Sequence, residues 1–161
     1  MHAITRRLEF DAGHRVYQHE SKCAHVHGHR YVVEVTCKQK IKELDNLGRV
    51  IDFSVIKQVF GTWIDDELDH GMILYVKDPL CDVWKYFGNS GVRRMVEKHP
   101  VSDRVFDVSE QKHYIMDKNP TAENMAEMLF KKGNELLDPH GVQVTVITVW
   151  ETPNCRATYT E

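Results

Sequence analysis

The 161-residue sequence lacks several features that would place it in a special class of protein. It has no run of 18 or more apolar residues, so we expect no membrane-spanning helix. Residues 1–7 lead into an alternating segment and not into an apolar signal core, which argues against secretion. With a net charge of −3, the chain also lacks the basic excess of nucleic-acid-binding proteins. We therefore expect a cytoplasmic protein that binds neither membranes nor nucleic acids.

Paired cysteines and glycine-rich phosphate loops are absent as well. The four cysteines contain no Cys-x-x-Cys pair, so the sequence predicts reduced thiols and no disulfide scaffold. The segment Gly88-Asn89-Ser90-Gly91 matches neither of the glycine patterns that cradle phosphates, and we interpret it as a turn. Any chemistry of this chain must therefore come from other residues.

The periodicity of apolar residues predicts four strands and two helices. Strands are expected over residues 4–14, 27–37 and 142–150, with a last strand ending near Tyr159. A helix capped by Ser54 is expected to run to about Leu68, since its apolar residues recur at helical spacing. A second helix is expected from the N-cap Thr121 to just before Asp138.

This order of elements, ββααββ, predicts an α+β fold. Paired strands at each end with helices between them favour a four-stranded antiparallel sheet with two helices on one face. We expect one domain over residues 1–161. Residues 75–118 interrupt the scheme, and we interpret them as an insertion with weak helices, too short for a core of their own. A lid over a site and an added subunit contact are both open for this insertion.

Histidine is the residue type that stands out. There are 10 histidines, and five of them fall within sixteen residues: His14, His19, His25, His27 and His29. His27 and His29 share one face of a strand, roughly 6–7 Å apart. His14 ends the neighbouring strand and could supply a third nitrogen. Three histidines without a fourth protein ligand are typical of a catalytic zinc site with an open position.

Cys23 precedes His27 by four residues and allows two interpretations. As a fourth zinc ligand it would make the site closed and structural, in a binding module without catalysis. As a free thiol beside the metal it could act as a base or a nucleophile. The residues alone do not decide between these two roles.

Two further positions carry acidic groups of interest. Asp69 directly precedes His70 and could orient it in a proton relay, although a solvated helix end is the ordinary alternative. Glu151 follows the apolar strand 142–150, where a buried carboxylate needs a hydrogen-bond donor. A glutamate facing water at the strand end is equally compatible with the pattern.

Six segments, in this order along the chain, resemble the signature of the 6-pyruvoyl-tetrahydropterin synthase / 6-carboxytetrahydropterin synthase family. They are Phe10-Asp11-Ala12-Gly13-His14, Cys23-Ala24-His25-Val26-His27-Gly28-His29, Ile51-Asp52-Phe53, Leu68-Asp69-His70, Pro120-Thr121-Ala122-Glu123-Asn124 and Trp150-Glu151-Thr152. The resemblance implies a tunnelling fold (T-fold), in which subunits of a homo-oligomer surround a pore and active sites lie between subunits.

The resemblance also implies a role for each site residue. The implied roles are zinc ligation by His14, His27 and His29, base catalysis by Cys23, a relay through Asp69 and His70, pterin anchoring by Glu151, and substrate binding by Thr121 and Glu123. Zinc is the implied cofactor, and a pterin triphosphate is the implied small-molecule substrate.

The Cys-x-x-x-His-Gly-His spacing resembles the bacterial 6-carboxytetrahydropterin synthases of the queuosine and 7-deazapurine route. The implied reaction converts 7,8-dihydroneopterin triphosphate to 6-carboxy-5,6,7,8-tetrahydropterin and releases acetaldehyde and triphosphate. The alternative within the family is 6-pyruvoyl-tetrahydropterin synthase activity on the same substrate.

Overall fold

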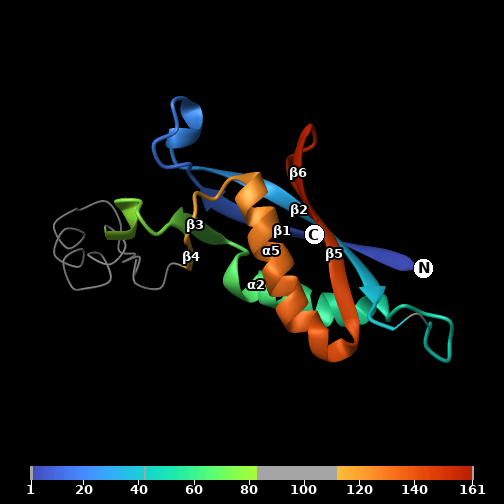
Figure 1. The fold of residues 1–161 in the computed structure, drawn as a ribbon. Helices are drawn as coiled ribbons and strands as arrows, with labels where there is room; N and C mark the ends of the chain where they lie inside the picture. Colours follow the sequence, from blue (N-terminus) through green and yellow to red (C-terminus); the bar gives the residue numbers. More distant parts are fainter. Residues whose placement is uncertain (1, 42, 83–111, 161) are drawn as a thin grey trace, which may run out of the picture.

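The computed structural model describes residues 2–41, 43–82 and 112–160, and within them six strands form one sheet (Figure 1). The strands are β1 (Ala3–His14), β2 (His27–Gln39), β3 (Gly71–Tyr75), β4 (His113–Met116), β5 (Val142–Thr152) and β6 (Cys155–Thr160). Their order across the sheet is β4-β3-β1-β2-β5-β6. The four strands expected from the sequence are thus confirmed as β1, β2, β5 and β6.

The prediction of a four-stranded, wholly antiparallel sheet is wrong. Strands β1, β2, β5 and β6 pair antiparallel, but β3 adds to β1 in parallel and β4 adds to β3 in parallel. Strand β3 is only 5 residues long and pairs with β1 through three residues. A short apolar segment of this kind shows no alternation by which a strand could be recognised.

The segment interpreted as an insertion, residues 75–118, contributes to the sheet at both of its ends. Strand β3 ends at Tyr75, and β4 occupies His113–Met116. Residues 83–111, on which the expected weak helices fall, lie outside the described residues.

The first expected helix is present as three consecutive pieces: α1 (Phe53–Ile56), a π-helical turn (Lys57–Gly61) and α2 (Thr62–Glu67). Its N-cap is Asp52 and not Ser54, which corrects the prediction. The Asp52 carboxylate accepts hydrogen bonds from both the N–H and the hydroxyl of Ser54, at 2.8 and 2.7 Å. Ser54 therefore lies inside the first turn, where its own side chain is a donor.

The second helix, α5 (Ala122–Leu137), begins after Thr121 as expected. The Thr121 hydroxyl accepts a hydrogen bond from the N–H of Asn124, which satisfies one donor of the first turn. A 3-10 turn at Asp138–His140 then leads into β5. Among the described residues, no helix is both long and apolar enough to span a membrane.

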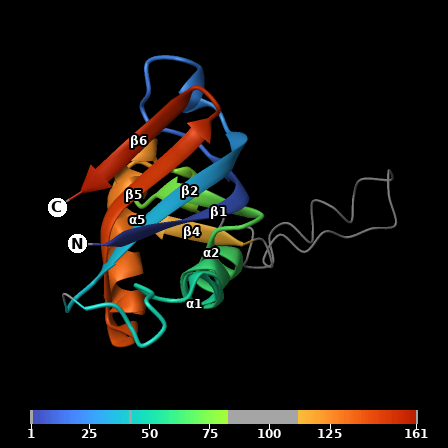
Figure 2. The ribbon, with the colours of Figure 1, turned by 90° about the vertical axis from the view of Figure 1, so that its right-hand side faces the viewer.

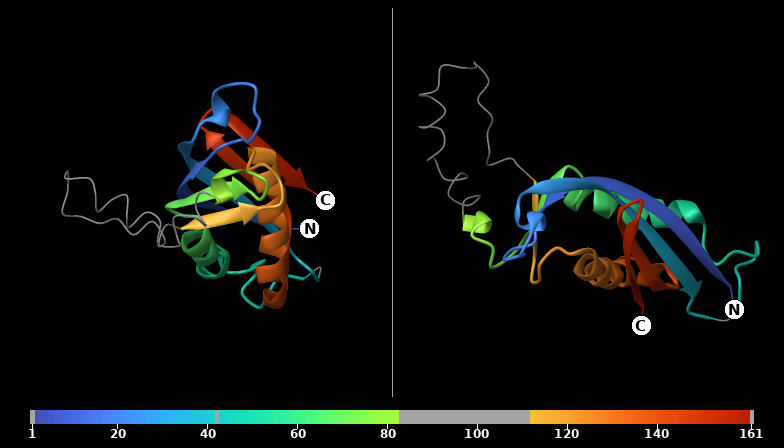
Figure 3. Two further views of the ribbon diagram at one scale, coloured as in Figure 1. Left: turned by 90° about the vertical axis from the view of Figure 1, so that its left-hand side faces the viewer. Right: turned by 90° about the horizontal axis from the view of Figure 1, so that it is seen from above.

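Both helical segments cover the same face of the sheet, as predicted (Figure 2). The core between them and the strands includes Leu8, Phe10, Tyr31, Val33, Val35, Phe60, Ile64, Met125, Leu129, Ile147 and Val149. In β1 the buried residues alternate with exposed ones such as Glu9, since successive side chains point to opposite faces. The two long strands, β1 and β2, curve along the molecule (Figure 3).

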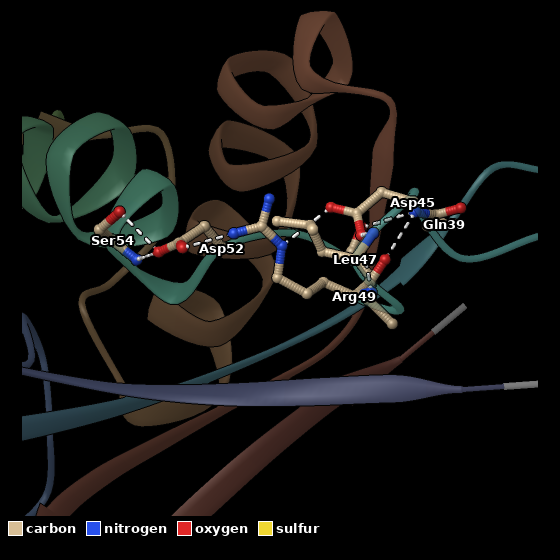
Figure 4. Close-up of polar contacts among 7 residues, drawn as sticks. Gln39, Asp45, Leu47, Arg49, Asp52 and Ser54 are labelled. Carbon is tan, nitrogen blue, oxygen red and sulfur yellow. Dashed lines mark hydrogen bonds and ion pairs between the residues drawn. The ribbon is translucent and has the colours of Figure 1, made fainter.

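The connection from β2 to α1 is a turn built from charged side chains (Figure 4). The Asp45 carboxylate accepts hydrogen bonds from the N–H of Leu47, the N–H of Arg49 and the Arg49 guanidinium, each at 2.9 Å. The same guanidinium donates to Asp52 at 2.9 Å. Gly48 takes a φ of +78° in this turn, a conformation that favours glycine. These contacts hold the turn at the end of the sheet away from His27.

Candidate active site

Three histidines, His14, His27 and His29, meet where β1 ends and β2 begins. The antiparallel register places His14 directly opposite His27 and His29 opposite Ala12. All three side chains lie on the same face of the sheet, and their ligand nitrogens lie within 4.8 Å of one another. Gly28, between the two β2 histidines, allows the strands a close approach, since a Cβ there would meet the Ala12 carbonyl oxygen at 3.0 Å.

Hydrogen bonds on the outer side of two rings define which nitrogen carries the proton. His14 Nδ1 lies 2.9 Å from the Pro120 carbonyl oxygen, and His27 Nδ1 lies 2.8 Å from that of His25. A carbonyl oxygen only accepts, so each Nδ1 carries the hydrogen and each neutral ring keeps a lone pair on Nε2. Those two Nε2 atoms face each other at 3.1 Å. Two facing lone pairs are stabilised by a cation between them.

The third nitrogen supports the same interpretation. His29 Nε2 is buried and has no hydrogen-bond partner among the described residues. Burial lowers the pKa of both His14 and His29, which favours the neutral form that binds metals. Three imidazole nitrogens are the donor set that zinc takes in open sites, and carbonyl partners orient two of the three rings, those of His14 and His27. The three histidines form a group that could hold a metal ion.

Glu151, near the end of β5, lies beside this group. Its Oε1 is 3.5 Å from His14 Nε2 and 3.8 Å from His29 Nε2, and its side chain is 27% exposed. It also lines a cavity of about 640 Å³ together with His29, Trp150 and Pro153. Of the two alternatives that the sequence left open for Glu151, its position beside the histidines and its partial burial favour the partly buried carboxylate over a glutamate facing water.

Asp69 and His70 form a hydrogen-bonded pair in the turn after α2. His70 Nδ1 lies 2.6 Å from Asp69 Oδ2, and Asp69 Oδ1 accepts the N–H of Asp11 at 2.8 Å. Partial burial raises the pKa of Asp69, but the hydrogen bonds from Asp11 and His70 outweigh it, so the pKa is lowered and the carboxylate stays charged. His70 has a φ of +57°, an uncommon conformation outside glycine that is concentrated at functional sites.

The His70 side chain is 79% exposed, and His70 and His29 both line a cleft. This cleft has a volume of about 490 Å³ and is also lined by Asp11, Gly28 and Arg30. Asp11 and Arg30 alternate with the core residues of β1 and β2, so this cleft lies on the face of the sheet opposite the one that carries the three histidine side chains.

The other predicted site residues are not joined to the histidines by side-chain contacts within the described residues. Cys23 lies half-buried in a short 3-10 turn, Lys22–Ala24, and its thiol makes no hydrogen bond there to the histidines or to Asp69. Thr121 uses its hydroxyl as the α5 N-cap. Glu123 is exposed in the first turn of α5.

Three residues near the site escaped the sequence analysis. Pro120 orients His14 through its carbonyl, and Asp11 holds the relay turn through its backbone, donating to Asp69 and accepting from the His70 N–H at 2.7 Å. Tyr31 is fully buried against His14 and His29, with a hydroxyl lacking a partner among the described residues. Tyr31 could have been found from the sequence, because it follows His29 by two residues and so lies on the same face of the strand. The contacts of Pro120 and Asp11 are made by backbone groups, which leave no signal in the sequence.

Comparisons with known proteins agree with this geometry. The family model described as 6-pyruvoyl tetrahydropterin synthase matches residues 3–161. The chain belongs to this family. The family resemblance noted in the sequence is thereby confirmed.

Within the 6-pyruvoyl tetrahydropterin synthase family, a curated relative from Rickettsia bellii is named 6-carboxy-5,6,7,8-tetrahydropterin synthase. It is 39% identical over 155 residues, which cover 94% of each chain. A solved structure of an uncharacterized protein from Wolinella succinogenes matches with a TM-score of 0.77 and 26% identity, covering 99% of this chain and 98% of that one. The 6-pyruvoyl tetrahydropterin synthase of Caenorhabditis elegans matches with a TM-score of 0.60 and 21% identity, covering 99% and 94%. The fold is the α+β fold of this family, with β3 and β4 completing its sheet.

Proposed function

We propose that this protein is a zinc-dependent lyase that converts 7,8-dihydroneopterin triphosphate and one water to 6-carboxy-5,6,7,8-tetrahydropterin, releasing acetaldehyde and triphosphate. The observation that carries the proposal is the convergence of three histidine nitrogens next to Glu151. The name shared by relatives from Rickettsia bellii and Aquifex aeolicus supports the 6-carboxy product. The protein would then act in queuosine or 7-deazapurine biosynthesis.

His14, His27 and His29 would hold the zinc ion, in line with the facing lone pairs of His14 and His27 and the unpartnered nitrogen of His29. Bound zinc supplies Lewis-acid chemistry, because it polarises substrate oxygens and acidifies the adjacent C–H. The Pro120 and His25 carbonyls keep the His14 and His27 rings in the tautomer that this task requires.

Glu151 would anchor the pterin ring. A carboxylate accepts two hydrogen bonds from a guanidine-like edge, as it does from arginine. The cavity of about 640 Å³ that Glu151 lines offers room for a bicyclic ring, with Trp150 and Val32 as apolar walls. Since Glu151 is within 4 Å of two metal-ligand nitrogens, a ring held there lies beside the zinc. Thr121 and Glu123 complete the proposed substrate-binding residues.

Cys23 would remove the proton from the substrate, and Asp69 and His70 would relay it. Within the described residues of one chain, no hydrogen bond links the Cys23 thiol to this pair. The proposal therefore includes a homo-oligomer in which the residues of one active site come from neighbouring subunits. This arrangement is also what the family resemblance implies.

Product identification tests the proposed reaction. Purified, zinc-loaded protein is incubated with 7,8-dihydroneopterin triphosphate, and both acetaldehyde and the pterin product are quantified. We expect acetaldehyde and 6-carboxytetrahydropterin in equal amounts. A 6-pyruvoyl product without acetaldehyde would instead support the second candidate, 6-pyruvoyl-tetrahydropterin synthase activity, which the description of the family model favours.

A further inference from the structure

The loop between β1 and β2, residues 15–26, carries Cys23 but has little regular structure of its own. Its one helical turn is Lys22–Ala24. The Val16 N–H donates to the Cys23 carbonyl at 2.8 Å, and the His19 N–H donates to the Val16 carbonyl at 3.1 Å. The place of Cys23 therefore depends on where the backbone at residues 16 and 17 is held.

Asn119 holds that backbone from 102 residues away in the sequence. Its Oδ1 accepts the Tyr17 N–H at 2.8 Å, and its Nδ2 donates to the Tyr17 carbonyl at 3.0 Å. Of the short side chains, only an asparagine amide offers an acceptor and a donor that engage both groups of one residue at once. Both hydrogen bonds are partly buried, where exchange with water is hindered.

The segment that carries Asn119 is itself anchored on both sides. The Asn119 carbonyl accepts hydrogen bonds from the Thr121 N–H at 2.8 Å and from Asn124 Nδ2 at 2.9 Å, which join it to the start of α5. The next carbonyl, that of Pro120, accepts from His14 Nδ1 at 2.9 Å. Figure 1 shows the N-terminal end of α5 beside the end of the sheet from which this loop departs. One rigid segment thus contacts a histidine of the metal group and the loop of Cys23.

We propose that Asn119 is a positioning residue that sets the Cys23 thiol relative to the metal held by His14, His27 and His29. Its side chain hydrogen-bonds to the backbone of Tyr17, and it acts on Cys23 through Tyr17 and Val16. The inference rests on the proposed function, in which Cys23 is the base. Because a displacement of about 1 Å at a reacting group can cost on the order of 100-fold in rate, a loosened loop should lower kcat.

The test compares Asn119→Asp with Asn134→Asp in the zinc-loaded, full-length protein. Aspartate has nearly the shape of asparagine but cannot donate to the Tyr17 carbonyl. Asn134 on α5 is the matched control, because its amide makes the same pair of hydrogen bonds to the backbone of Val144, at 3.1 and 3.0 Å. Each variant is measured for kcat, KM, zinc content, thermal stability and the rate at which iodoacetamide alkylates Cys23. Peptide mass mapping separates Cys23 from the exposed Cys155, which serves as an internal reference.

For Asn119→Asp we expect kcat to fall by about 10- to 100-fold, with KM within about threefold of wild type and zinc retained. The Cys23 alkylation rate should change while that of Cys155 stays constant. Asn134→Asp should lose thermal stability and keep both kcat and the Cys23 alkylation rate. An unchanged kcat in Asn119→Asp, or a loss in both variants that follows their thermal stability, would overturn the proposal.

Failure of the proposed function gives a different result. If wild-type protein forms no pterin product, the lyase proposal fails, and if Cys23→Ala turns over at the wild-type rate, the role of Cys23 as base fails. Alkylation needs no turnover, so it still decides about Asn119. If the Cys23 alkylation rate changes in Asn119→Asp but not in Asn134→Asp, Asn119 positions the loop. If it does not change in Asn119→Asp, the proposed role of Asn119 is rejected.

Discussion

Two clusters of polar side chains lie at opposite ends of β2, and they differ in how completely their hydrogen-bonding atoms have partners. At the His27 end, three imidazole nitrogens converge, and one of them is buried without a partner among the described residues. At the Gln39 end, the charged side chains of Asp45, Arg49 and Asp52 hydrogen-bond to each other and to the neighbouring backbone (Figure 4). The first group has a nitrogen without a hydrogen-bond partner, whereas both carboxylates of the second group are hydrogen-bonded by Arg49 and by backbone N–H groups.

This difference separates a site from a structural turn. Buried polar atoms without partners cost free energy, so the unpartnered His29 nitrogen beside the facing nitrogens of His14 and His27 indicates a site for a bound ion. Exposed, mutually paired charges cost little and need nothing further. Electrostatics differ accordingly: burial lowers the pKa of His14 and keeps it neutral, while a backbone hydrogen bond from Arg49 lowers the pKa of Asp45 and keeps it charged.

The largest expected effect comes from removing a histidine of the metal group. His27→Ala should lower zinc affinity by at least about 100-fold and abolish turnover, since loss of an outer partner alone costs 10- to 100-fold. Metal analysis after dialysis measures how much zinc each variant retains. His25→Ala is the control, because only the His25 carbonyl contacts His27 and that group is kept. Equal zinc retention in both variants would mean that the His27 end is no metal site.

Cys23→Ala should have the next largest effect, on rate alone. We expect the variant to keep its zinc and to lose about 10²- to 10⁴-fold in turnover, the usual contribution of a general base. Zinc stoichiometry and steady-state kinetics check this, with Cys155→Ala at the exposed start of β6 as control. Loss of stoichiometric zinc would instead favour a closed structural site in a binding module, with Cys23 as fourth ligand.

Glu151→Gln should weaken pterin binding by about 10- to 100-fold and leave zinc occupancy intact. A charged acceptor contributes on the order of 1.5–3 kcal/mol to a hydrogen bond, and the amide replaces one acceptor by a donor. Titration with a pterin analogue measures the affinity. Glu34→Gln is the matched control, because Glu34 lines the same cavity as Glu151. Unchanged affinity in Glu151→Gln would remove this residue from the site.

The smallest effect is expected at the other end of β2. Asp52→Ala removes the α1 N-cap and should lower Tm by about 2–4 °C, with zinc content and turnover unchanged. Hydrogen bonds from the hydroxyl and the N–H of Ser54 lower the pKa of Asp52 below its ordinary value of 3.8. Its stabilisation is therefore present above pH 3.8 and is lost as the pH falls through the lower folded-state pKa.

Measuring the Tm at pH 7 and at decreasing pH checks this prediction. The control is Asp66→Asn, which changes an exposed aspartate of α2. The difference between wild type and Asp52→Ala should shrink in acid. A loss of zinc or of turnover in Asp52→Ala would show that the two ends of β2 are coupled, against the comparison drawn above.

Much of the fold was predictable because local patterns carry it. Alternation identified β1, β2, β5 and β6, and helical spacing identified the two helical segments. Strands β3 and β4 could not be predicted, since the pairing of β3 with β1 and of β4 with β3 depends on contacts between distant parts of the chain. The N-cap was misplaced by two residues because Asp52 and Ser54 are both good caps, and only the backbone path shows which carboxylate or hydroxyl reaches the free N–H.

The sequence by itself determined the residue types of the site and their order: three histidines on two adjacent strands, a cysteine between them, and a glutamate near the end of the last long strand. These features can be predicted because strand periodicity and residue spacing are properties of short stretches of sequence. The tertiary structure alone decided that the Pro120 carbonyl orients His14, that Asp11 holds the Asp69–His70 turn, and that Asn119 holds the loop of Cys23. These are hydrogen bonds of backbone groups to residues 58 to 106 positions away. Every residue has the same backbone groups, so only the folded chain shows which of them meet.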